Sequence, residues 1–228
     1  MLSKVSDTVA AALGDVPDES TVLIGGFGLV GQPAELIDGL LAHGAKNLTI
    51  VNNNAGNGDT GIAALLAAGR VRKVVCSFPR QSDSWVFDGL YRAGKVELDV
   101  VPQGNLAERI RAGGAGIPAF YSPVGVGTTL AVGKEEREFN GRRYILEPAI
   151  RGDLALVGAF LGDRLGNLVY RRTSRNFNPI MATAATTTIA QVDRVVPVGE
   201  LDPENVVTPG IYVDTVFAVG ERPWLRDL

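Results

Sequence analysis

The most constraining feature of this 228-residue sequence is a short apolar segment that recurs four times in its first half. Each segment is rich in Val, Ile and Leu, as strands buried on both faces of a parallel sheet are. The segments are residues 21–24, 47–52, 71–77 and 96–101. A helical pattern follows each of them, near residues 33–43, 60–68, 83–93 and 105–112. The alternation predicts an α/β fold, with an open, mostly parallel sheet flanked by helices.

Local signals mark where several of these helices begin and end. Pro33 is typical of a first helical turn, and Asn105 with Glu108 has the spacing of a capping box. A shorter helix is expected before the first apolar segment, with Ser3 as its N-cap and Gly14 near its end. These signals fall between the apolar segments, which supports the α/β prediction.

The pattern changes around residues 115–150, where we expect a small antiparallel excursion. Glycine and proline become frequent, and Asn140-Gly141 is typical of a tight hairpin turn. The regular structure expected after it comprises strands near 153–160, 187–196 and 211–219 and a helix that opens at Asn178. No internal repeat or convincing linker divides the sequence, so we expect residues 1–228 to form a single domain.

Composition and charge exclude several classes of function. An apolar fraction of 46% allows a substantial core. The net charge of −3 and the pI near 5.3 give no general electrostatic reason to bind nucleic acid or an anionic membrane. A single cysteine, Cys76, rules out an internal disulfide, and the single histidine, His43, is expected to meet carbonyls at a helix end. We expect no metal site, and a cytoplasmic location because Met1–Lys4 begins no apolar leader.

Four loops are expected to meet at one edge of the sheet. In a right-handed parallel α/β sheet, the loops that leave the carboxyl ends of the strands emerge together, and ligands bind there. The loops are Gly25–Gly28, Asn53–Gly58, Phe78–Asp83 and Pro102–Asn105. They are rich in glycine, backbone amides and carboxamide side chains, which donate hydrogen bonds without transferring protons. Such groups suit carboxylates, thioester carbonyls and the oxyanions formed when a carbonyl is attacked.

The first loop contains a G-x-G-x-x-G string at Gly26, Gly28 and Gly31, which on its own suggests a dinucleotide-binding Rossmann fold. In that fold an acidic residue at the end of the second strand binds the ribose. In this sequence the second strand runs into Asn52 and Asn53 instead. An NAD-dependent dehydrogenase is therefore a disfavoured alternative.

Two sets of arginines are open to more than one interpretation. Arg80, in the third loop, has the charge to hold an anion, although a solvated arginine is the ordinary finding at such a position. Arg171, Arg172 and Arg175 lie within five residues of one another. That cluster suits a phosphate or carboxylate substrate and equally an interface between subunits, and the sequence leaves both open.

Several segments, in order along nearly the whole chain, resemble the alpha subunit of the family I 3-oxoacid CoA-transferases. They are residues 25–33, 53–56, 102–114, 118–121, 137–141 and 175–179. Residues 74–84, which read VVCSFPRQSDS, look most like the 3-oxoadipate branch of that family. The succinyl-CoA:3-ketoacid branch carries a different sequence at this loop. The resemblance implies the CoA-transferase fold, an α/β fold of the NagB/RpiA-like kind.

The same resemblance implies a reaction and a partner. In this family CoA passes from an acyl-CoA such as succinyl-CoA to a free 3-oxoacid by a ping-pong mechanism, through a glutamyl-CoA thioester. The nucleophilic glutamate stands in a Ser-Glu-Asn-Gly loop of the beta subunit, and this sequence contains no Glu-Asn-Gly. The resemblance therefore implies a beta-subunit partner, an α2β2 assembly, coenzyme A thioester as substrate and no permanently bound cofactor.

Carried over residue by residue, the resemblance assigns Asn53, Asn54 and Gln103 to substrate positioning and oxyanion stabilisation. The residues that it implies in substrate binding are Gly25, Gly26, Phe27, Gly28, Gly56 and Arg80. The expected acceptor is 3-oxoadipate, and acetoacetate, the acceptor of the 3-ketoacid branch, is the alternative. A non-catalytic ligand-binding subunit on the same fold is an alternative from another class of function.

Overall fold

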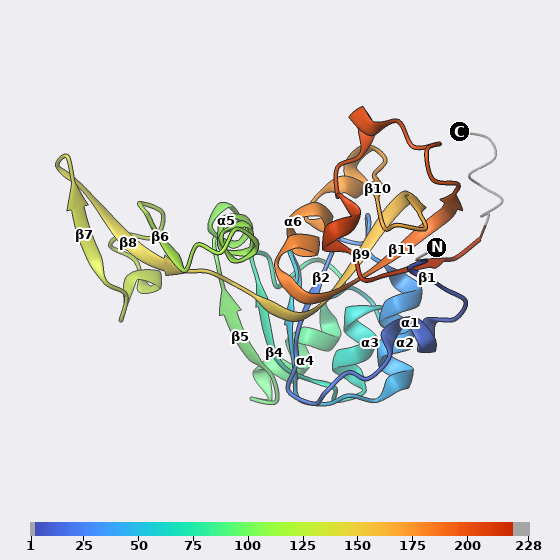
Figure 1. The fold of residues 1–228 in the computed structure, drawn as a ribbon. Coiled ribbons are helices and arrows are strands. Elements are labelled where there is room, and N and C mark those ends of the chain that lie inside the picture. Colours follow the sequence, from blue (N-terminus) through green and yellow to red (C-terminus); the bar gives the residue numbers. More distant parts are fainter. Residues whose placement is uncertain (1–2, 221–228) are drawn as a thin grey trace.

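The computed structural model describes residues 3–220, and a nine-stranded sheet runs through it (Figure 1). The strand order is β1-β12-β11-β9-β2-β3-β4-β5, and β10 pairs with β9 outside this path. Every pair is parallel except β10 with β9. The bounds are β1 (Val5–Ser6), β2 (Thr21–Ile24), β3 (Leu48–Val51), β4 (Val71–Cys76), β5 (Glu97–Val100), β9 (Gly152–Asp163), β10 (Leu168–Val169), β11 (Ala185–Val196) and β12 (Thr215–Ala218). The predicted open, mostly parallel sheet is confirmed.

Helices cover both faces of this sheet (Figure 1). One face carries α1 (Val9–Leu13), α2 (Ala34–His43), α3 (Ile62–Ala67) and α4 (Trp85–Arg92), and the other carries α5 (Gln103–Gly114) and α6 (Asn178–Thr183). Strand side chains alternate between two cores, because successive residues of a strand point to opposite faces. Val22 and Ile24 pack with α1–α4, whereas Leu23 packs with α5 and α6. Burial on both faces explains why the strands read as continuous apolar runs.

A three-stranded antiparallel sheet projects from the body of the molecule beyond α5 (Figure 1). Its order is β6-β8-β7, with bounds β6 (Ala119–Ser122), β7 (Glu136–Phe139) and β8 (Arg142–Pro148). We call residues 119–148 the arm. Asn140 and Gly141 join β7 to β8 with φ values of 49° and 76°, the left-handed conformations that suit a two-residue hairpin turn. The antiparallel excursion expected around residues 115–150 is confirmed.

The first helix is shorter than its sequence predicts. α1 begins at Val9, and its N-cap is Thr8, whose hydroxyl oxygen accepts a hydrogen bond from the Ala11 N–H at 3.1 Å. Ser3 lies ahead of β1, so its predicted role as N-cap is wrong. The chain from Val5 first adds an edge strand to the sheet, and only then turns into the helix.

The start of α5 also differs from the prediction. The helix begins at Gln103, directly after Pro102, so Asn105 lies inside its first turn. The capping box expected from Asn105 and Glu108 is therefore wrong. Glu108 accepts a hydrogen bond from the Arg111 Nε at 2.8 Å, and Asn105 is buried with its side chain turned toward the arm.

The later elements follow the prediction with one exception. The strand expected near 187–196 is β11, and the helix expected at Asn178 is α6. The strand expected near 211–219 is divided, since a 3₁₀ turn precedes the short β12. The 3₁₀ turns are Thr129–Ala131, Arg172–Arg175, Pro203–Asn205 and Gly210–Tyr212. Among residues 3–220, no helix has the length and apolar character needed to cross a membrane.

Candidate active site

The order in which the chain adds strands reverses between β2 and β9, which are parallel neighbours near the centre of the sheet. From β2 the chain builds outward through β3, β4 and β5, and from β9 it builds the other way through β11 and β12. Ligands of open α/β sheets bind at such a switch point, beside the carboxyl ends of the strands. The loop after β2, residues 25–32, lies at this point, and we call it the glycine loop.

The glycine loop is a tight turn with an apolar tip. Phe27 and Val30 exchange two backbone hydrogen bonds, at 3.0 and 3.2 Å, which fold residues 27–30 into a small hairpin. The side chains of Phe27, Leu29 and Val30 are 47%, 61% and 49% exposed. The N–H groups of Gly28 and Leu29 donate to no atom within residues 3–220. The tip therefore offers both apolar surface and unused backbone donors.

Asn176, which lies between β10 and α6, holds this hairpin in place. Its Oδ1 accepts a hydrogen bond from the Gly26 N–H at 3.1 Å, and its Nδ2 donates to the Val30 carbonyl at 3.0 Å. The Gly25 N–H donates to the Leu156 carbonyl of β9 at 2.9 Å. The amides of Gly25 and Gly26 therefore serve the fold, and the unused donors lie at the tip.

Asn178, the first residue of α6, fills the space behind the glycine loop. Its Oδ1 accepts from the Gly158 N–H at 2.8 Å, and its Nδ2 donates to the carbonyls of Gly31 at 3.1 Å and Ser174 at 2.8 Å. A Cβ added to Gly25 would lie 1.7 Å from Asn178 Oδ1. Gly25 is therefore required by close packing against a buried carboxamide.

Three asparagines, residues 52–54, lead from β3 into the second loop, and each is no more than 1% exposed. Asn52 Nδ2 donates to the Ile24 carbonyl at 2.6 Å, and Asn52 Oδ1 accepts from the Asn54 N–H at 2.9 Å. Asn54 Nδ2 donates to the Gly28 carbonyl at 3.2 Å. Carboxamides thus bridge the second loop to the first. A carboxylate in the place of Asn52 would have no N–H to donate to the Ile24 carbonyl.

Asn53 and Gln103 are in direct contact at the same edge. Gln103 Nε2 donates to Asn53 Oδ1 at 3.1 Å, and the Ser77 hydroxyl donates to the same oxygen at 2.8 Å. These bonds orient the Asn53 carboxamide through its oxygen, and its NH₂ group donates to no atom in the part of the chain that the structure describes. Gln103 is exposed at the first position of α5. The structure therefore brings together the second and fourth loops.

A hollow of about 250 Å³ lies between the glycine loop, the start of α5 and the start of α6. The residues that line it are Phe27, Gln103, Gly104, Ala107, Asn176, Phe177 and Ile180. All of them are uncharged, and none is a nucleophile or a general base. The hollow combines apolar walls with carboxamides, which suits the orientation of a polar, non-titrating group such as a thioester.

The helix after the glycine loop is not arranged as a pyrophosphate site. In a dinucleotide-binding fold, the N–H groups at the start of this helix point toward the phosphates. In this structure the Leu36 N–H of α2 donates to Gln191 Oε1 of β11 at 3.2 Å. The glycine loop folds upon itself as a hairpin. The geometry therefore gives no support to the dehydrogenase alternative.

Of the six predicted substrate-binding residues, Phe27 alone lines this hollow, and Gly56 and Arg80 have other partners. The Gly56 N–H donates to Asn54 Oδ1 at 2.9 Å, and a Cβ at Gly56 would lie 2.6 Å from the Ala63 backbone nitrogen of α3. Arg80 is exposed, and its Nε donates to Asp88 Oδ1 at 2.7 Å. Gly56 thus allows α3 to approach, and Arg80 is paired within its own loop and helix.

A second hollow, of about 390 Å³, contains two of the three clustered arginines. Arg171 and Arg172 line it together with Leu29 of the glycine loop. The Arg171 guanidinium lies over the ring of Phe160, 5.3 Å from its centroid. Arg175 does not belong to this lining. The cluster is therefore split, and its first two members lie beside the glycine loop.

The single histidine accepts a backbone hydrogen bond, and the single cysteine is buried. His43 Nε2 accepts a hydrogen bond from the Val16 N–H at 3.4 Å, so the contact with helix-terminal carbonyls that the sequence suggests is wrong. Burial raises the pKa of Cys76 to about 12, which keeps it a neutral thiol near neutral pH. Within residues 3–220, no group of three or more His, Cys, Asp and Glu side chains is placed to hold a metal ion.

Comparison with known proteins settles the family. A sequence profile described as Coenzyme A transferase matches residues 6–218. The chain belongs to this family. It is 64% identical to the alpha chain of 3-oxoadipate CoA-transferase of Pseudomonas putida over 219 residues, which are 96% of this chain and 95% of that protein. It is 47% identical to the corresponding chain of a succinyl-CoA:3-ketoacid coenzyme A transferase of Helicobacter pylori over 221 residues, 97% of this chain and 94% of that protein.

Solved structures share the CoA-transferase fold at lower identity. Glutaconate coenzyme A-transferase of Acidaminococcus fermentans superimposes with a TM-score of 0.84 at 20% identity, covering 96% of this chain and 76% of that one. An acyl-CoA transferase of Escherichia coli O157:H7, solved as a thioester complex with CoA, gives 0.83 at 24% identity. That match covers 95% of this chain and 47% of the other, so this chain spans about half of that protein. The expected fold is confirmed.

Asn176 and Asn178 contact the glycine loop beside this candidate site, and the sequence analysis did not predict those contacts. They belong to a segment that carries the family resemblance, yet nothing in their spacing links them to the glycine loop. The sequence predicts only that Asn178 opens a helix. Their partners lie up to 150 positions away in the sequence, so the contact becomes visible only in the folded chain.

Proposed function

We propose that this chain is the alpha subunit of a two-chain enzyme that transfers CoA from succinyl-CoA to 3-oxoadipate. The observation that carries the proposal is the contact of Asn53 with Gln103 beside the exposed tip of the glycine loop. Two relatives at 64% and 61% identity, from Pseudomonas putida and Acinetobacter baylyi, are named as the corresponding chain of 3-oxoadipate CoA-transferase. This naming supports the choice of acceptor.

In the proposed mechanism the nucleophile comes from the partner chain. A glutamate of the beta subunit first attacks the thioester of succinyl-CoA, which gives an acyl-glutamyl anhydride and releases the CoA thiolate. The thiolate then attacks the glutamyl carbonyl, expels succinate and leaves a glutamyl-CoA thioester. The acceptor carboxylate reverses these two steps. The uncharged lining of the hollow supports this division of labour, since none of its residues is able to act as nucleophile.

Each of these steps passes through a tetrahedral oxyanion, and we assign its stabilisation to the carboxamides of Gln103 and Asn53. Gln103 Nε2 carries two hydrogens and gives one to Asn53, so the second is available to an oxyanion. The unused N–H groups of Gly28 and Leu29 are further donors for a substrate or glutamate carboxylate. We assign Asn54, Gly25, Gly26 and Gly56 to the support of these donors. Phe27 supplies an apolar wall.

The assembly is also part of the proposal. The apolar tip of the glycine loop, with Leu29 and Val30 exposed, is where we place the beta subunit, because an exposed apolar patch next to an incomplete site suits an interface. We propose an α2β2 complex in which residues 1–228 of each alpha chain form one domain. Arg171 and Arg172 line the hollow beside this tip, so they are placed to meet either substrate or partner.

The test is to co-express the chain with its cognate beta subunit, then to assay CoA transfer from succinyl-CoA. Transfer to 3-oxoadipate with much higher kcat/KM than to acetoacetate is the expected result. Preference for acetoacetate would favour the succinyl-CoA:3-ketoacid alternative, which the Helicobacter pylori relative represents. A pure complex that transfers CoA to neither acid would refute the proposal.

A trapping experiment tests where the covalent intermediate forms. Borohydride reduces a glutamyl thioester to an alcohol, so treatment of the succinyl-CoA-loaded complex should mark one glutamate of the beta subunit. Mass spectrometry of both chains locates the mark. A stable modification on a glutamate of the alpha chain would overturn the proposed division of labour.

A further inference from the structure

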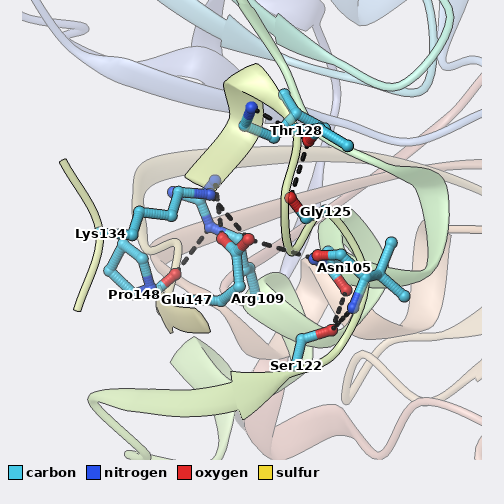
Figure 2. Close-up of polar contacts among 10 residues, drawn as sticks. Asn105, Arg109, Ser122, Gly125, Thr128, Lys134, Glu147 and Pro148 are labelled. Atoms are coloured by element: carbon cyan, nitrogen blue, oxygen red, sulfur yellow. Dashed lines mark hydrogen bonds and ion pairs between the residues drawn. The ribbon is translucent and has the colours of Figure 1, made fainter. Parts of the chain in front are cut away.

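A fully buried carboxylate lies where the arm joins α5 (Figure 2). Glu147 of β8 accepts two hydrogen bonds at Oε1, from Lys134 Nζ at 2.7 Å and from Asn105 Nδ2 at 3.1 Å. Its Oε2 makes no hydrogen bond and lies 3.9 Å from Arg109 Nη1. Burying a carboxylate is costly unless charged and polar partners surround it in good geometry. The site therefore favours one arrangement of the arm and the helix.

The network grips α5 on a single face. Asn105 and Arg109 are four residues apart, so they lie one above the other on the helix surface. Arg109 Nε donates to the Pro148 carbonyl at 2.7 Å, and the Ser122 hydroxyl donates to Asn105 Oδ1 at 2.8 Å (Figure 2). Both strands that flank this junction, β6 and β8, thus hold the first turns of the helix.

The other faces of α5 connect the Glu147 network to the proposed site. Leu106 and Ile110 are buried in the core, whereas Gln103 and Ala107 line the 250 Å³ hollow. No side chain caps the start of α5. Its first turn is therefore fixed by Leu106 in the core and by Asn105 in the network, two residues beyond Gln103.

We propose that Glu147 is a positioning residue: through Asn105 it fixes the first turn of α5, and so holds the Gln103 carboxamide against Asn53. This inference rests on the proposed function, because Gln103 matters to turnover only if it stabilises the transition state. A displacement of a catalytic group by about 1 Å can lower a rate by about 100-fold. Loss of the Glu147 charge should therefore lower kcat and leave KM for succinyl-CoA nearly unchanged.

The experiment is a double-mutant cycle in the two-chain complex, with Glu147→Gln and Gln103→Ala alone and together. Glu147→Gln alone should lower kcat by at least about tenfold. In the Gln103→Ala background it should lower kcat no further, because the group that it positions is already gone. Asn105→Ala, which keeps the pair of Glu147 with Lys134 but cuts the link to the helix, should behave in the same way.

Hydrogen exchange of the complex supplies a readout that does not depend on turnover. Glu147→Gln should speed exchange in the first two turns of α5 and leave α6 unchanged. The matched control is Glu136→Gln, which removes a more exposed carboxylate paired with Arg143 in the same arm and should change neither readout.

Equal losses of kcat in both backgrounds, or unchanged exchange in α5, would overturn the positioning role. If Glu147→Gln prevents assembly, Asn105→Ala decides the question by the same two readouts. A wild-type complex without transferase activity would count against the proposed function alone, because the exchange result would still show whether Glu147 orders α5.

Discussion

Replacing Asn178 by alanine should lower the free energy of unfolding more than replacing an exposed asparagine does. The side chain is completely buried. It links three backbone groups from three different segments, the Gly158 N–H and the carbonyls of Gly31 and Ser174, at 2.8 to 3.1 Å. Each group would lose its carboxamide partner in the Asn178→Ala variant. The substitution therefore strikes the glycine loop, β9 and the 3₁₀ turn before α6 at once.

The expected size follows from these three bonds. A hydrogen bond contributes about 1 kcal/mol net, and a buried group left without a partner costs about 1–3 kcal/mol. Two of the three groups are carbonyls, and water entering the vacated space would satisfy part of what is lost, so we take the lower end. The free energy of unfolding should fall by about 3 kcal/mol. For a chain of this size that corresponds to a fall in Tm of about 6–12 °C.

Differential scanning calorimetry of the purified complex measures this fall. Asn178→Asp is a sharper variant, because it keeps the volume and the Oδ1 acceptor but places a second oxygen opposite the carbonyls of Gly31 and Ser174. It should be at least as destabilising as alanine. The matched control is Asn205→Ala, which removes one exposed hydrogen bond to Asp202 and should shift Tm by no more than about 2 °C.

A Tm for Asn178→Ala within the range of the Asn205→Ala control would refute this reasoning. It would mean that the loop and β9 are held by their own backbone, and that the carboxamide is a passive filler. A benign Asn178→Asp would refute it in another way, because the two carbonyls would then not be accepting hydrogen bonds from this side chain.

Three further variants test separate parts of the structure. Gln103→Ala should lower kcat by about 100-fold with an unchanged Tm, since it removes an exposed oxyanion donor, and turnover equal to wild type would contradict that role. Gly25→Ala should lower Tm because its Cβ would lie 1.7 Å from Asn178 Oδ1, and combining it with Asn178→Ala should cost less than the sum of the two; strict additivity would count against the clash. Burial raises the pKa of Cys76 to about 12 from its usual value near 9, so its contribution to stability is complete below about pH 9 and is lost as the pH rises toward about 12. Cys76→Ala should flatten that part of the stability profile, and an unchanged profile would contradict the assignment.

The sheet was predictable because burial on both faces leaves a signal, a run of apolar residues, within each short segment of the sequence. Val22, Leu23 and Ile24 must all be apolar when alternate residues enter two different cores, and a run of this kind is visible in any short window. The start of α5 was less predictable. Asn105 and Glu108 have the spacing of a capping box, but the helix already begins directly after Pro102, and the arm offers Asn105 better partners. Tertiary contacts overrode a correct local pattern.

The edge that carries the site was predictable for a similar reason. The topology of parallel βα units sends the loops to one side, so the meeting of Asn53 with Gln103 follows from the order of the elements. Loop order alone says nothing of which amides are already used. The Gly26 N–H donates to Asn176, which lies 150 positions later in the sequence, whereas the Gly28 N–H donates to no atom within residues 3–220.

The G-x-G-x-x-G string shows how little such a motif specifies by itself. Gly26 has a φ of 118°, and a Cβ there would lie 2.5 Å from Gln32 Cγ. Gly28 has a φ of 62° at the hairpin tip, and a Cβ on Gly31 would lie 2.6 Å from the Ser174 carbonyl oxygen. Glycine is required at these positions for different reasons, and none of the reasons involves a phosphate. A pyrophosphate cradle needs backbone N–H groups that converge on one point. In this chain the Gly26 N–H already donates to Asn176 Oδ1, so the backbone donors that remain in the loop are those of Gly28 and Leu29 at its tip. The ligand of a glycine loop is thus set by what lies behind it as much as by its own sequence.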